Sequence, residues 1–184
     1  MPENTTDLGK FNNDWYQPGA SVLKRFLWHC FSACFFISRF PFNGIKKGML
    51  RMFGAKIGKG VVIKPSVNIK SPWLLEVGDH SWIGENSWID NLVRVRIGAN
   101  CCISQGALLL TGNHDYKKST FDLVTGEIVL EDGVWIGAKS VVCPGVTCRS
   151  HSVLTVGSVA TKEMEAYFIY RGNPAVKTRE RKIS

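Results

Sequence analysis

An apolar residue recurs every six positions over most of this sequence. Counted from Ile57, the first position of each hexapeptide is apolar in all 15 units, whereas an overall apolar content of 45% predicts roughly seven by chance. The fifth position holds Val, Ser, Ala or Cys in 12 of the 15 units, with Trp73, Asn113 and Met164 as the exceptions. Because a period of six does not keep one face of an α-helix apolar, the pattern excludes amphipathic helices here and predicts short strands. The first positions are Ile57, Ile63, Ile69, Val77, Ile83, Ile89, Ile97, Ile103, Leu109, Leu130, Ile136, Val142, Cys148, Leu154 and Ala160.

The larger spacing predicts how the strands are arranged. Ile57 and Val77 are 20 residues apart, as are Val77 and Ile97, while Leu130 and Cys148 are 18 apart. Three strands with a corner after each form one triangular coil, and the early coils absorb two extra residues at one corner. The first residue of each hexapeptide points inward and stacks on its equivalent about 4.8 Å away, and the fifth residue must be small. Glycine after the first residue, as in "IGAN" and "IGAK", supplies the corner conformations that a side chain would obstruct. Such short-period repeats build an all-β parallel β-helix.

The six-residue pattern stops between Leu109 and Leu130, which are 21 residues apart. About three of these residues complete an ordinary unit, so we expect a loop to protrude at about 115–127. His114 lies at the root of the loop, where a neutral imidazole can accept the proton of a hydroxyl group, and a free imidazole has a pKa of about 6.5. Asp115 could orient the ring. From spacing alone, a lone loop histidine is more often a solvated surface residue, and that alternative stays open here.

Four segments are predicted along the chain. Residues 1–22 are polar and lack the charged-then-apolar start of a signal peptide. Residues 23–52 form an apolar and basic helical segment, and the repeats occupy residues 53–166. Residues 167–184 are a basic C-terminal extension.

The apolar run Phe26–Ser38 has two interpretations. It is 13 residues long, shorter than the roughly 20 residues of a membrane-spanning helix. It is either a helix packed on the main domain or on a neighbouring subunit, or a helix lying on an anionic membrane surface, because Lys24, Arg25 and Arg39 flank it. Both interpretations can hold at once.

The net charge limits the classes of binding partner, and the cysteine spacing bears on metal sites and disulfides. The net charge of +8 suggests an anionic partner, either a membrane surface, a nucleic acid or a phosphorylated cofactor. The charge is spread over both termini with no nucleic-acid recognition motif, so we expect no nucleic acid. The six cysteines show no spacing typical of a zinc site or a disulfide framework. Cys101, Cys102 and Cys148 lie within the apolar pattern, so we expect these three to be reduced and buried.

Several motifs resemble one family of enzymes. Units such as "IGENSW", "IGANCC" and "IGAKSV" are similar to the repeats of left-handed β-helix acyltransferases, and the handedness is taken from that resemblance. The stretch "VWIGAKSVVCPGVTCRSHSVLTVGSVATKEM" followed by "IYRGNPAVKTR" resembles sugar O-acetyltransferases. The stretch "WIGENSWIDNLVRVRIGANCCISQGALLLTGNHDY" is closer to the colanic-acid (WcaF-type) acetyltransferases of exopolysaccharide synthesis. The resemblance covers roughly residues 23–179 and implies acetyl transfer.

The resemblance implies roles for particular residues. His114 corresponds to the general base. The donor, acetyl-CoA, would lie in a groove between subunits of a homotrimer, with Trp135 beside its thiol end. Its amide and phosphate contacts would come from Ala138, Val156, Thr161, Lys162 and Arg179, with Lys177 in place of a family arginine that is Val176 here. In the acceptor pocket Asp90 would bind sugar hydroxyls, and Glu85 and Asn86 lie near a family asparagine in a different register.

We therefore expect an O-acetyltransferase that acts on a sugar or a lipid-linked oligosaccharide, without a metal. We expect it in the cytoplasm, with a possible peripheral contact on the inner face of the membrane. A zinc hydratase would need three histidine ligands, and only His80 and His114 lie in plausible places. A non-catalytic scaffold or membrane-binding subunit is the other alternative.

Overall fold

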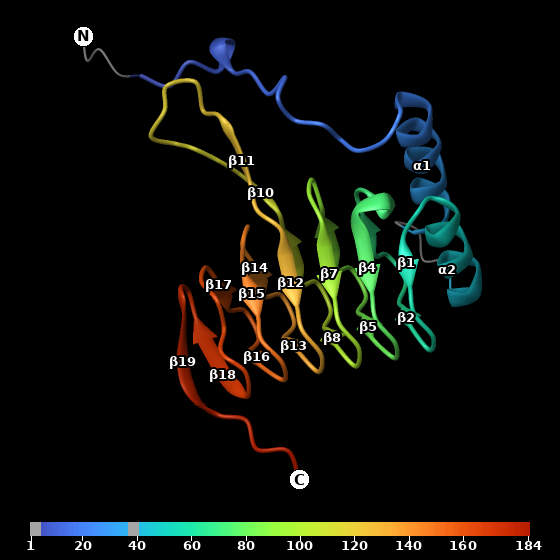
Figure 1. The fold of residues 1–184 in the computed structure, drawn as a ribbon, viewed down its shortest axis with the longest axis vertical. Helices are drawn as coiled ribbons and strands as arrows, with labels where there is room; N and C mark the ends of the chain where they lie inside the picture. Colours follow the sequence, from blue (N-terminus) through green and yellow to red (C-terminus); the bar gives the residue numbers. More distant parts are fainter. Residues whose placement is uncertain (1–4, 37–40) are drawn as a thin grey trace.

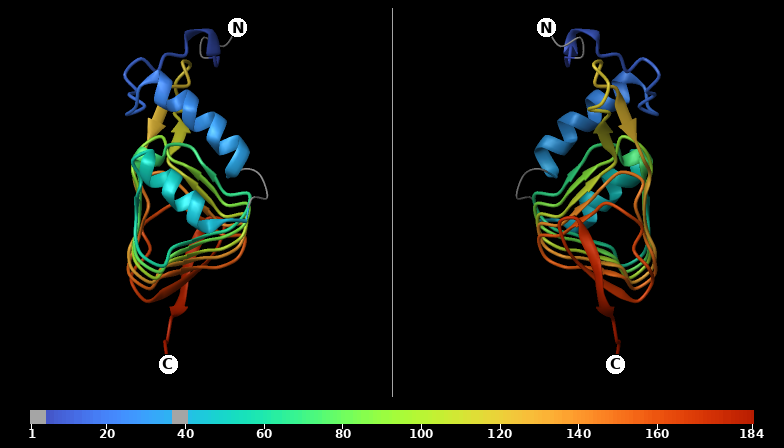
Figure 2. Two further views of the ribbon diagram at one scale, coloured as in Figure 1. Left: turned by 90° about the vertical axis from the view of Figure 1, so that its right-hand side faces the viewer. Right: turned by 90° about the vertical axis from the view of Figure 1, so that its left-hand side faces the viewer.

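The hexapeptide repeats form a triangular solenoid, with helices at one end and a β-hairpin at the other (Figure 1). The structure, a computed structural model, describes residues 5–36 and 41–184. Seen along the axis of the solenoid, the successive coils overlie one another in a triangular outline (Figure 2). The predicted parallel β-helix is confirmed.

Each side of the triangle is a parallel sheet, because each strand pairs with its equivalent one coil away. Sheet A contains β1 (Lys56–Ile57), β4 (Leu75–Val77), β7 (Val95–Ile97), β12 (Ile128–Leu130) and β15 (Thr147–Cys148). Sheet B contains β2 (Val62–Ile63), β5 (Trp82–Ile83), β8 (Cys102–Ile103), β13 (Trp135–Ile136), β16 (Val153–Leu154), β18 (Phe168–Gly172) and β19 (Ala175–Glu180). Sheet C contains β3 (Asn68–Ile69), β6 (Trp88–Asp90), β9 (Leu108–Leu110), β14 (Val141–Val142) and β17 (Val159–Ala160).

The core consists of the residues that the six-residue pattern predicts. All 15 first positions are buried, and the register places them on one another, as in Ile63 against Ile83 and Ile83 against Ile103. Fully burying an isoleucine side chain contributes about 1.5–3 kcal/mol, so the stacked columns supply much of the driving force for folding. The small fifth positions, such as Ser81 and Ala107, are buried beside them.

The corner glycines are required because a side chain would obstruct the corner, as the sequence predicts. A Cβ atom on Gly78 would lie 2.5 Å from the carbonyl carbon of Gly98, so the close approach of the next coil excludes a side chain. The left-handed backbone conformation occurs two residues later, at His80 (φ 59°) and Asn100 (φ 55°). Glycine after the first position therefore permits close stacking of the coils rather than an unusual φ angle.

All the departures from the six-residue repeat occur at one corner, where the chain passes from sheet C to sheet A. We call it the C–A corner. In the first coil it carries a 3₁₀ helix at Pro72–Leu74, and in the second the two extra residues fall within the connection 91–94. In the third coil a hairpin of β10 (Gly112–His114) and β11 (Leu123–Thr125) projects from it. The predicted loop at 115–127 is thus partly an antiparallel ribbon that begins at Gly112.

Two helices cover the end of the first coil. They are α1 (Val22–Phe35), capped by the side chain of Ser21, and α2 (Asn43–Met52). Trp28 on α1 is buried, its ring lies 5.0 Å from that of Phe36, and its Nε1 donates to the carbonyl of Ile69 at 2.8 Å. The predicted run Phe26–Ser38 therefore forms most of α1, and its last two residues lie outside the described ones. Neither helix is both long and apolar enough to cross a membrane, within the part of the chain that the structure describes.

The C-terminal extension is more ordered than its basic composition indicates. Strands β18 and β19 pair antiparallel, and β18 also pairs with β16, so residues 168–180 close the far end of the solenoid. Thr178 donates through its hydroxyl to the carbonyl of Ile169 at 2.7 Å.

Two of the three cysteines expected in the core are buried. Cys101 and Cys148 are buried, whereas Cys30 and Cys34 are exposed on α1. Cys102 is expected to be buried but is only half-buried, because it precedes the inward-facing residue of β8 and therefore lies on the outer face of the sheet.

Candidate active site

His114 projects from the C–A corner at the end of the first strand of the hairpin. It pairs with Leu123 in the β10–β11 ribbon, and three residues before it Thr111 ties the ribbon to the coil below. The hydroxyl of Thr111 donates to the carbonyl of Asp90 at 2.9 Å and accepts the Leu92 N–H at 2.8 Å. The solenoid thus holds the root of the hairpin in place while the side chain of His114 stays partly exposed.

The imidazole of His114 is held in one orientation by Phe121. Its Nδ1 lies 2.9 Å from the carbonyl oxygen of Phe121, and the two rings stack with centroids 4.4 Å apart at an angle of 9°. A carbonyl oxygen can only accept a hydrogen bond, so Nδ1 carries the proton in the neutral ring. Nε2 is then left with a free lone pair, which is the arrangement a general base needs.

The tip of the hairpin places that carbonyl. Phe121 adopts φ 52°, an uncommon conformation for an aromatic residue. Asp122 holds the backbone beside it, since it accepts from the hydroxyl of Thr120 at 2.6 Å and from Nζ of Lys118 at 2.9 Å. These two hydrogen bonds lower the pKa of Asp122. Asp115, expected to orient the imidazole, instead accepts from the backbone N–H of Lys117.

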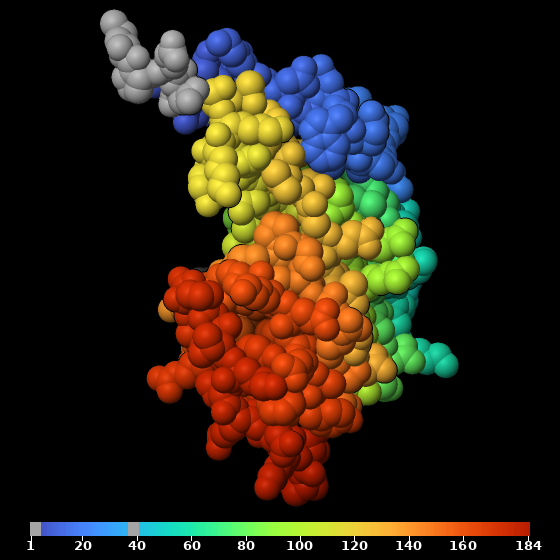
Figure 3. All heavy atoms as spheres, turned by 60° about the vertical axis from the view of Figure 1, so that its left-hand side comes forward, coloured from blue at the N-terminus to red at the C-terminus, as the bar shows by residue number. Residues whose placement is uncertain are grey.

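A second aromatic ring approaches His114 from the N-terminal segment. Residues 5–20, which we call the strap, run along the C–A corner, and Figure 3 shows this blue segment against the yellow hairpin. Phe11, just after a 3₁₀ helix at Leu8–Lys10, places its ring 5.7 Å from that of His114. The N–H of Asp7 donates to the carbonyl of Ser119 at 2.8 Å. Sequence reasoning missed this contact, because a polar segment with an isolated phenylalanine carries no pattern that indicates it.

The predicted acceptor residues are divided between two corners. Asp90, at the end of β6, lies next to the root of the hairpin, and its carboxylate pairs with Nζ of Lys70 at 2.8 Å. Glu85 and Asn86 lie exposed at the corner where sheet B passes to sheet C, which we call the B–C corner. Within one chain, only Asp90 is therefore brought near His114.

The predicted donor residues are divided in the same way. Ala138 and Val156 lie at the B–C corner, where the N–H of Gly157 donates to the carbonyl of Ala138 at 2.9 Å. Trp135 stands beside it on the outer face of sheet B, with its Nε1 donating to the hydroxyl of Ser104 at 2.9 Å. Thr161 and Lys162 follow β17, at the same C–A corner as His114 but two coils further along.

The two predicted cations of β19 differ in their surroundings. Nζ of Lys177 lies 2.8 Å from the carboxylate of Glu165 and 4.0 Å from the ring centroid of Phe168. The hydrogen bond to Glu165 raises the pKa of Lys177. Arg179 is exposed and makes no ion pair within residues 5–36 and 41–184, so its guanidinium is the more available for a phosphate.

Cysteine nucleophiles are not available in the core. Burial raises the pKa of Cys101 to about 11 and that of Cys148 to about 12. Both thiols are therefore protonated at neutral pH, and the thiol form is a poor nucleophile. The described residues hold no group of three or more His, Cys, Asp or Glu side chains that could bind a metal ion.

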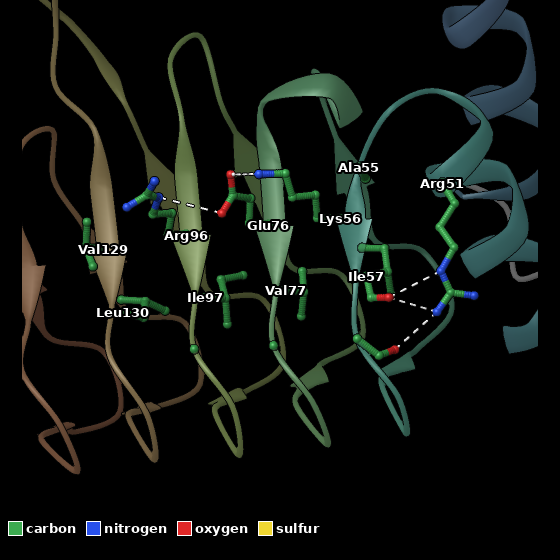
Figure 4. Close-up of a pocket in the computed structure, with 13 residues that line it drawn as sticks. Arg51, Ala55, Lys56, Ile57, Glu76, Val77, Arg96, Ile97, Val129 and Leu130 are labelled. Atoms are coloured by element: carbon green, nitrogen blue, oxygen red, sulfur yellow. Dashed lines mark hydrogen bonds and ion pairs between the residues drawn. The ribbon is translucent and has the colours of Figure 1, made fainter.

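A wide hollow of the surface lies away from these residues. It measures about 870 Å³ and runs over the outer face of sheet A (Figure 4). The carboxylate of Glu76 lies 2.9 Å from Nζ of Lys56 and 3.6 Å from Nε of Arg96, and Arg51 donates to the carbonyl of Ile57. The acid and the two cations on sheet A pair with one another, Arg51 is held by backbone carbonyls, and none of the predicted site residues lines this hollow, so we assign it no role in the site.

A relative in Escherichia coli (strain K12), assigned as the colanic acid biosynthesis acetyltransferase WcaF, is 39% identical over 176 residues, which are 95% of this chain and 97% of the relative. The chain belongs to the WcaF-type acetyltransferases. The galactoside O-acetyltransferase of Escherichia coli (strain K12) is 27% identical over 73% of this chain and 68% of its own length. No protein-family model matches the sequence.

The fold of this WcaF-type chain is shared with solved structures. A hexapeptide-repeat acetyltransferase from Vibrio cholerae O1 biovar eltor, complexed with acetyl coenzyme A, superposes with a TM-score of 0.79 at 23% identity and covers 90% of this chain and 92% of its own. At that identity the likeness shows the hexapeptide-repeat fold. Together with its family membership, this makes the chain an acetyltransferase, and the expected enzyme class is confirmed.

Proposed function

We propose that this enzyme transfers an acetyl group from acetyl-CoA to a hydroxyl group of a sugar during the synthesis of a surface glycan. The sugar acceptor is inferred from two relatives, one assigned to colanic acid biosynthesis and one a galactoside O-acetyltransferase. The observation that carries the mechanism is the hydrogen bond from Nδ1 of His114 to the carbonyl of Phe121, because it leaves Nε2 of the neutral ring with a free lone pair.

The reaction proceeds by direct attack in a ternary complex. Nε2 of His114 takes the proton from the sugar hydroxyl as its oxygen forms a bond to the thioester carbonyl carbon. The tetrahedral intermediate then loses the CoA thiolate, which receives the proton from the imidazolium, so that acetyl-sugar and free CoA leave. The carbonyl of Phe121 stabilises the imidazolium through its hydrogen bond to Nδ1. The raised pKa values of Cys101 and Cys148 support this route over an acyl-cysteine intermediate.

The position of the site residues supports a trimer. His114, Thr161 and Lys162 lie at the C–A corner, whereas Glu85, Asn86, Ala138 and Val156 lie at the B–C corner of the same chain. A site that uses both sets needs the C–A corner of one subunit against the B–C corner of the next. Trp82 and Trp135 stand 55% and 48% exposed on the outer face of sheet B, and a subunit interface would bury them. Acetyl-CoA would lie in this groove, with Lys162, Arg179 and Lys177 toward its phosphates.

The helical end of the solenoid suits a peripheral membrane contact on the cytoplasmic side. Val22, Leu23 and Phe26 of α1 are 72%, 67% and 62% exposed, and Met52 at the end of α2 is 66% exposed. Lys24 and Arg25 lie among them. Apolar residues flanked by cations bind anionic lipid headgroups, and such a contact would bring the enzyme close to a lipid-linked oligosaccharide.

The substitution His114→Asn tests the role of the imidazole. The amide of the new side chain can still donate to the Phe121 carbonyl but cannot accept a proton. We expect the release of free CoA thiol from acetyl-CoA with a sugar panel to fall by a factor on the order of 10²–10⁴, while the affinity for CoA is unchanged.

His80→Asn is the matched control. His80 occupies a left-handed corner position that asparagine tolerates, and it lies at a corner remote from the hairpin. Activity in His114→Asn above about a tenth of the wild-type rate would refute the assignment.

A further inference from the structure

A second cavity lies between α1, the strap and the first coils of sheet C. It measures about 430 Å³, within the range of small-molecule sites. One wall is α1, through Arg25, Trp28, His29 and Ser32, and the opposite wall is the end of β3 with Lys70 and Ser71. Trp73 and Trp88 complete an aromatic lining.

Three hydrogen bonds hold the walls of this cavity in place. Trp28 donates to the carbonyl of Ile69 at 2.8 Å, and Trp73 donates to the carbonyl of Pro18 at 2.7 Å. The hydroxyl of Tyr16 donates to the carbonyl of Leu92 at 2.9 Å. Each bond joins segments 41 or more residues apart in the chain, so the cavity is formed before any ligand arrives.

The charged groups of the cavity are mostly cationic and partly unused. Arg25 and His29 are four residues apart on α1 and therefore share one face of the helix. Neither side chain has an ion-pair or hydrogen-bond partner in the described part of the chain. Lys70 pairs with Asp90, which leaves Arg25 without a counter-charge. Burial raises the pKa of Tyr16, with Asp90 adding to the rise and Arg25 opposing it, so the phenol lies within electrostatic range of both.

The cavity adjoins the catalytic hairpin. Leu92 lines it and also packs on the hairpin, because a Cβ atom on Gly112 would lie within 2.3 Å of a Leu92 methyl group. Tyr16 of the cavity and Phe11 beside His114 lie on the same strap, five residues apart, a span of at most about 18 Å. An acceptor of two or three sugar rings would bridge that distance.

We propose that this cavity is an acceptor subsite for an anionic sugar unit, whose carboxylate or phosphate group pairs with Arg25 while its ring packs against Trp88. The inference rests on the proposed sugar O-acetyltransferase function. The guanidinium of Arg25 suits either anion, because its paired N–H groups match two oxygens at once. Trp88, 45% exposed, offers an aromatic face to the sugar ring. The subsite would make the enzyme selective for a charged glycan rather than for a neutral one.

Binding to the full chain tests the subsite independently of catalysis. Isothermal titration with methyl β-D-glucuronide and methyl β-D-glucoside compares the same ring with and without a carboxylate, and glucose 1-phosphate against glucose does so for a phosphate. We expect one charged probe to bind at least about tenfold more tightly than its neutral partner, and the pair that shows the difference identifies the anion.

Two variants locate the effect. Arg25→Gln is expected to remove the preference for the charged probe, whereas Lys59→Gln, which removes a cation on an exposed corner of another face, is expected to keep it. Equal affinities for charged and neutral probes, no measurable binding of either charged probe, or an unchanged preference in Arg25→Gln would overturn the proposal. Repeating the titration with His114→Asn separates the two ideas, because a charge preference that persists without acetyl transfer supports the subsite whatever the catalytic outcome.

Discussion

The contact between Phe11 and His114 leads to a quantitative prediction. The two rings are 5.7 Å apart and inclined at 59°, a geometry in which an aromatic pair contributes about 0.5–1.5 kcal/mol. With Phe121 stacked on the ring at 4.4 Å, Phe11 restricts the imidazole from a second direction. If the contact positions Nε2 for proton transfer, Phe11→Ala should raise the activation free energy by the same amount.

The expected loss follows from the size of the contact. Since 1.36 kcal/mol corresponds to a factor of ten in rate, Phe11→Ala should lower kcat by about 2- to 13-fold. The KM for acetyl-CoA should change little, because Phe11 belongs to the strap and not to the predicted donor residues. The assay is the release of CoA thiol at saturating acceptor.

A double-mutant cycle shows whether Phe11 acts through the imidazole. In the His114→Asn background, Phe11→Ala should produce no further loss of kcat. Leu8→Ala is the control on the same strap, since the side chain of Leu8 is 64% exposed. The reasoning is wrong if Phe11→Ala costs the same factor in both backgrounds, or if Leu8→Ala reduces kcat equally.

Two further predictions concern the helical end of the solenoid. Trp28→Phe leaves the carbonyl of Ile69 without its donor and should lower the free energy of unfolding in urea by about 2–4 kcal/mol, and a loss below about 1 kcal/mol would contradict the anchoring role of Trp28. Lys46 is buried with its Nζ on the carbonyl of Lys64, and burial lowers its pKa from 10.5. Between that lowered pKa and 10.5 the unfolded chain therefore binds more protons than the folded one, so the free energy of unfolding should rise with pH across this window. Urea titrations at several pH values measure this rise, and Lys46→Met should abolish it. An unchanged pH dependence in Lys46→Met would contradict the prediction.

Part of the candidate site could be predicted from the sequence, because the hairpin interrupts a regular repeat. The break after Leu109 marks the hairpin, and the histidine at its root stands out since the loop contains no other. The partner of that histidine was not readable. Asp115 is adjacent in sequence, but a backbone carbonyl seven residues away orients the ring, and any residue type supplies a carbonyl.

By itself, the sequence determined the solenoid, its coil length and the corner at which it departs from regularity. These properties depend on residues six and about twenty positions apart. Because each coil must bury the same positions against the next, the repeat shows them in every coil. Only the tertiary structure decided that the strap reaches His114, that α1 walls a cationic cavity, and that the predicted residues divide between two corners. Those contacts join segments with no shared period, such as Phe11 with His114 or Trp28 with Ile69, and their geometry arises only when the chain has closed around its core.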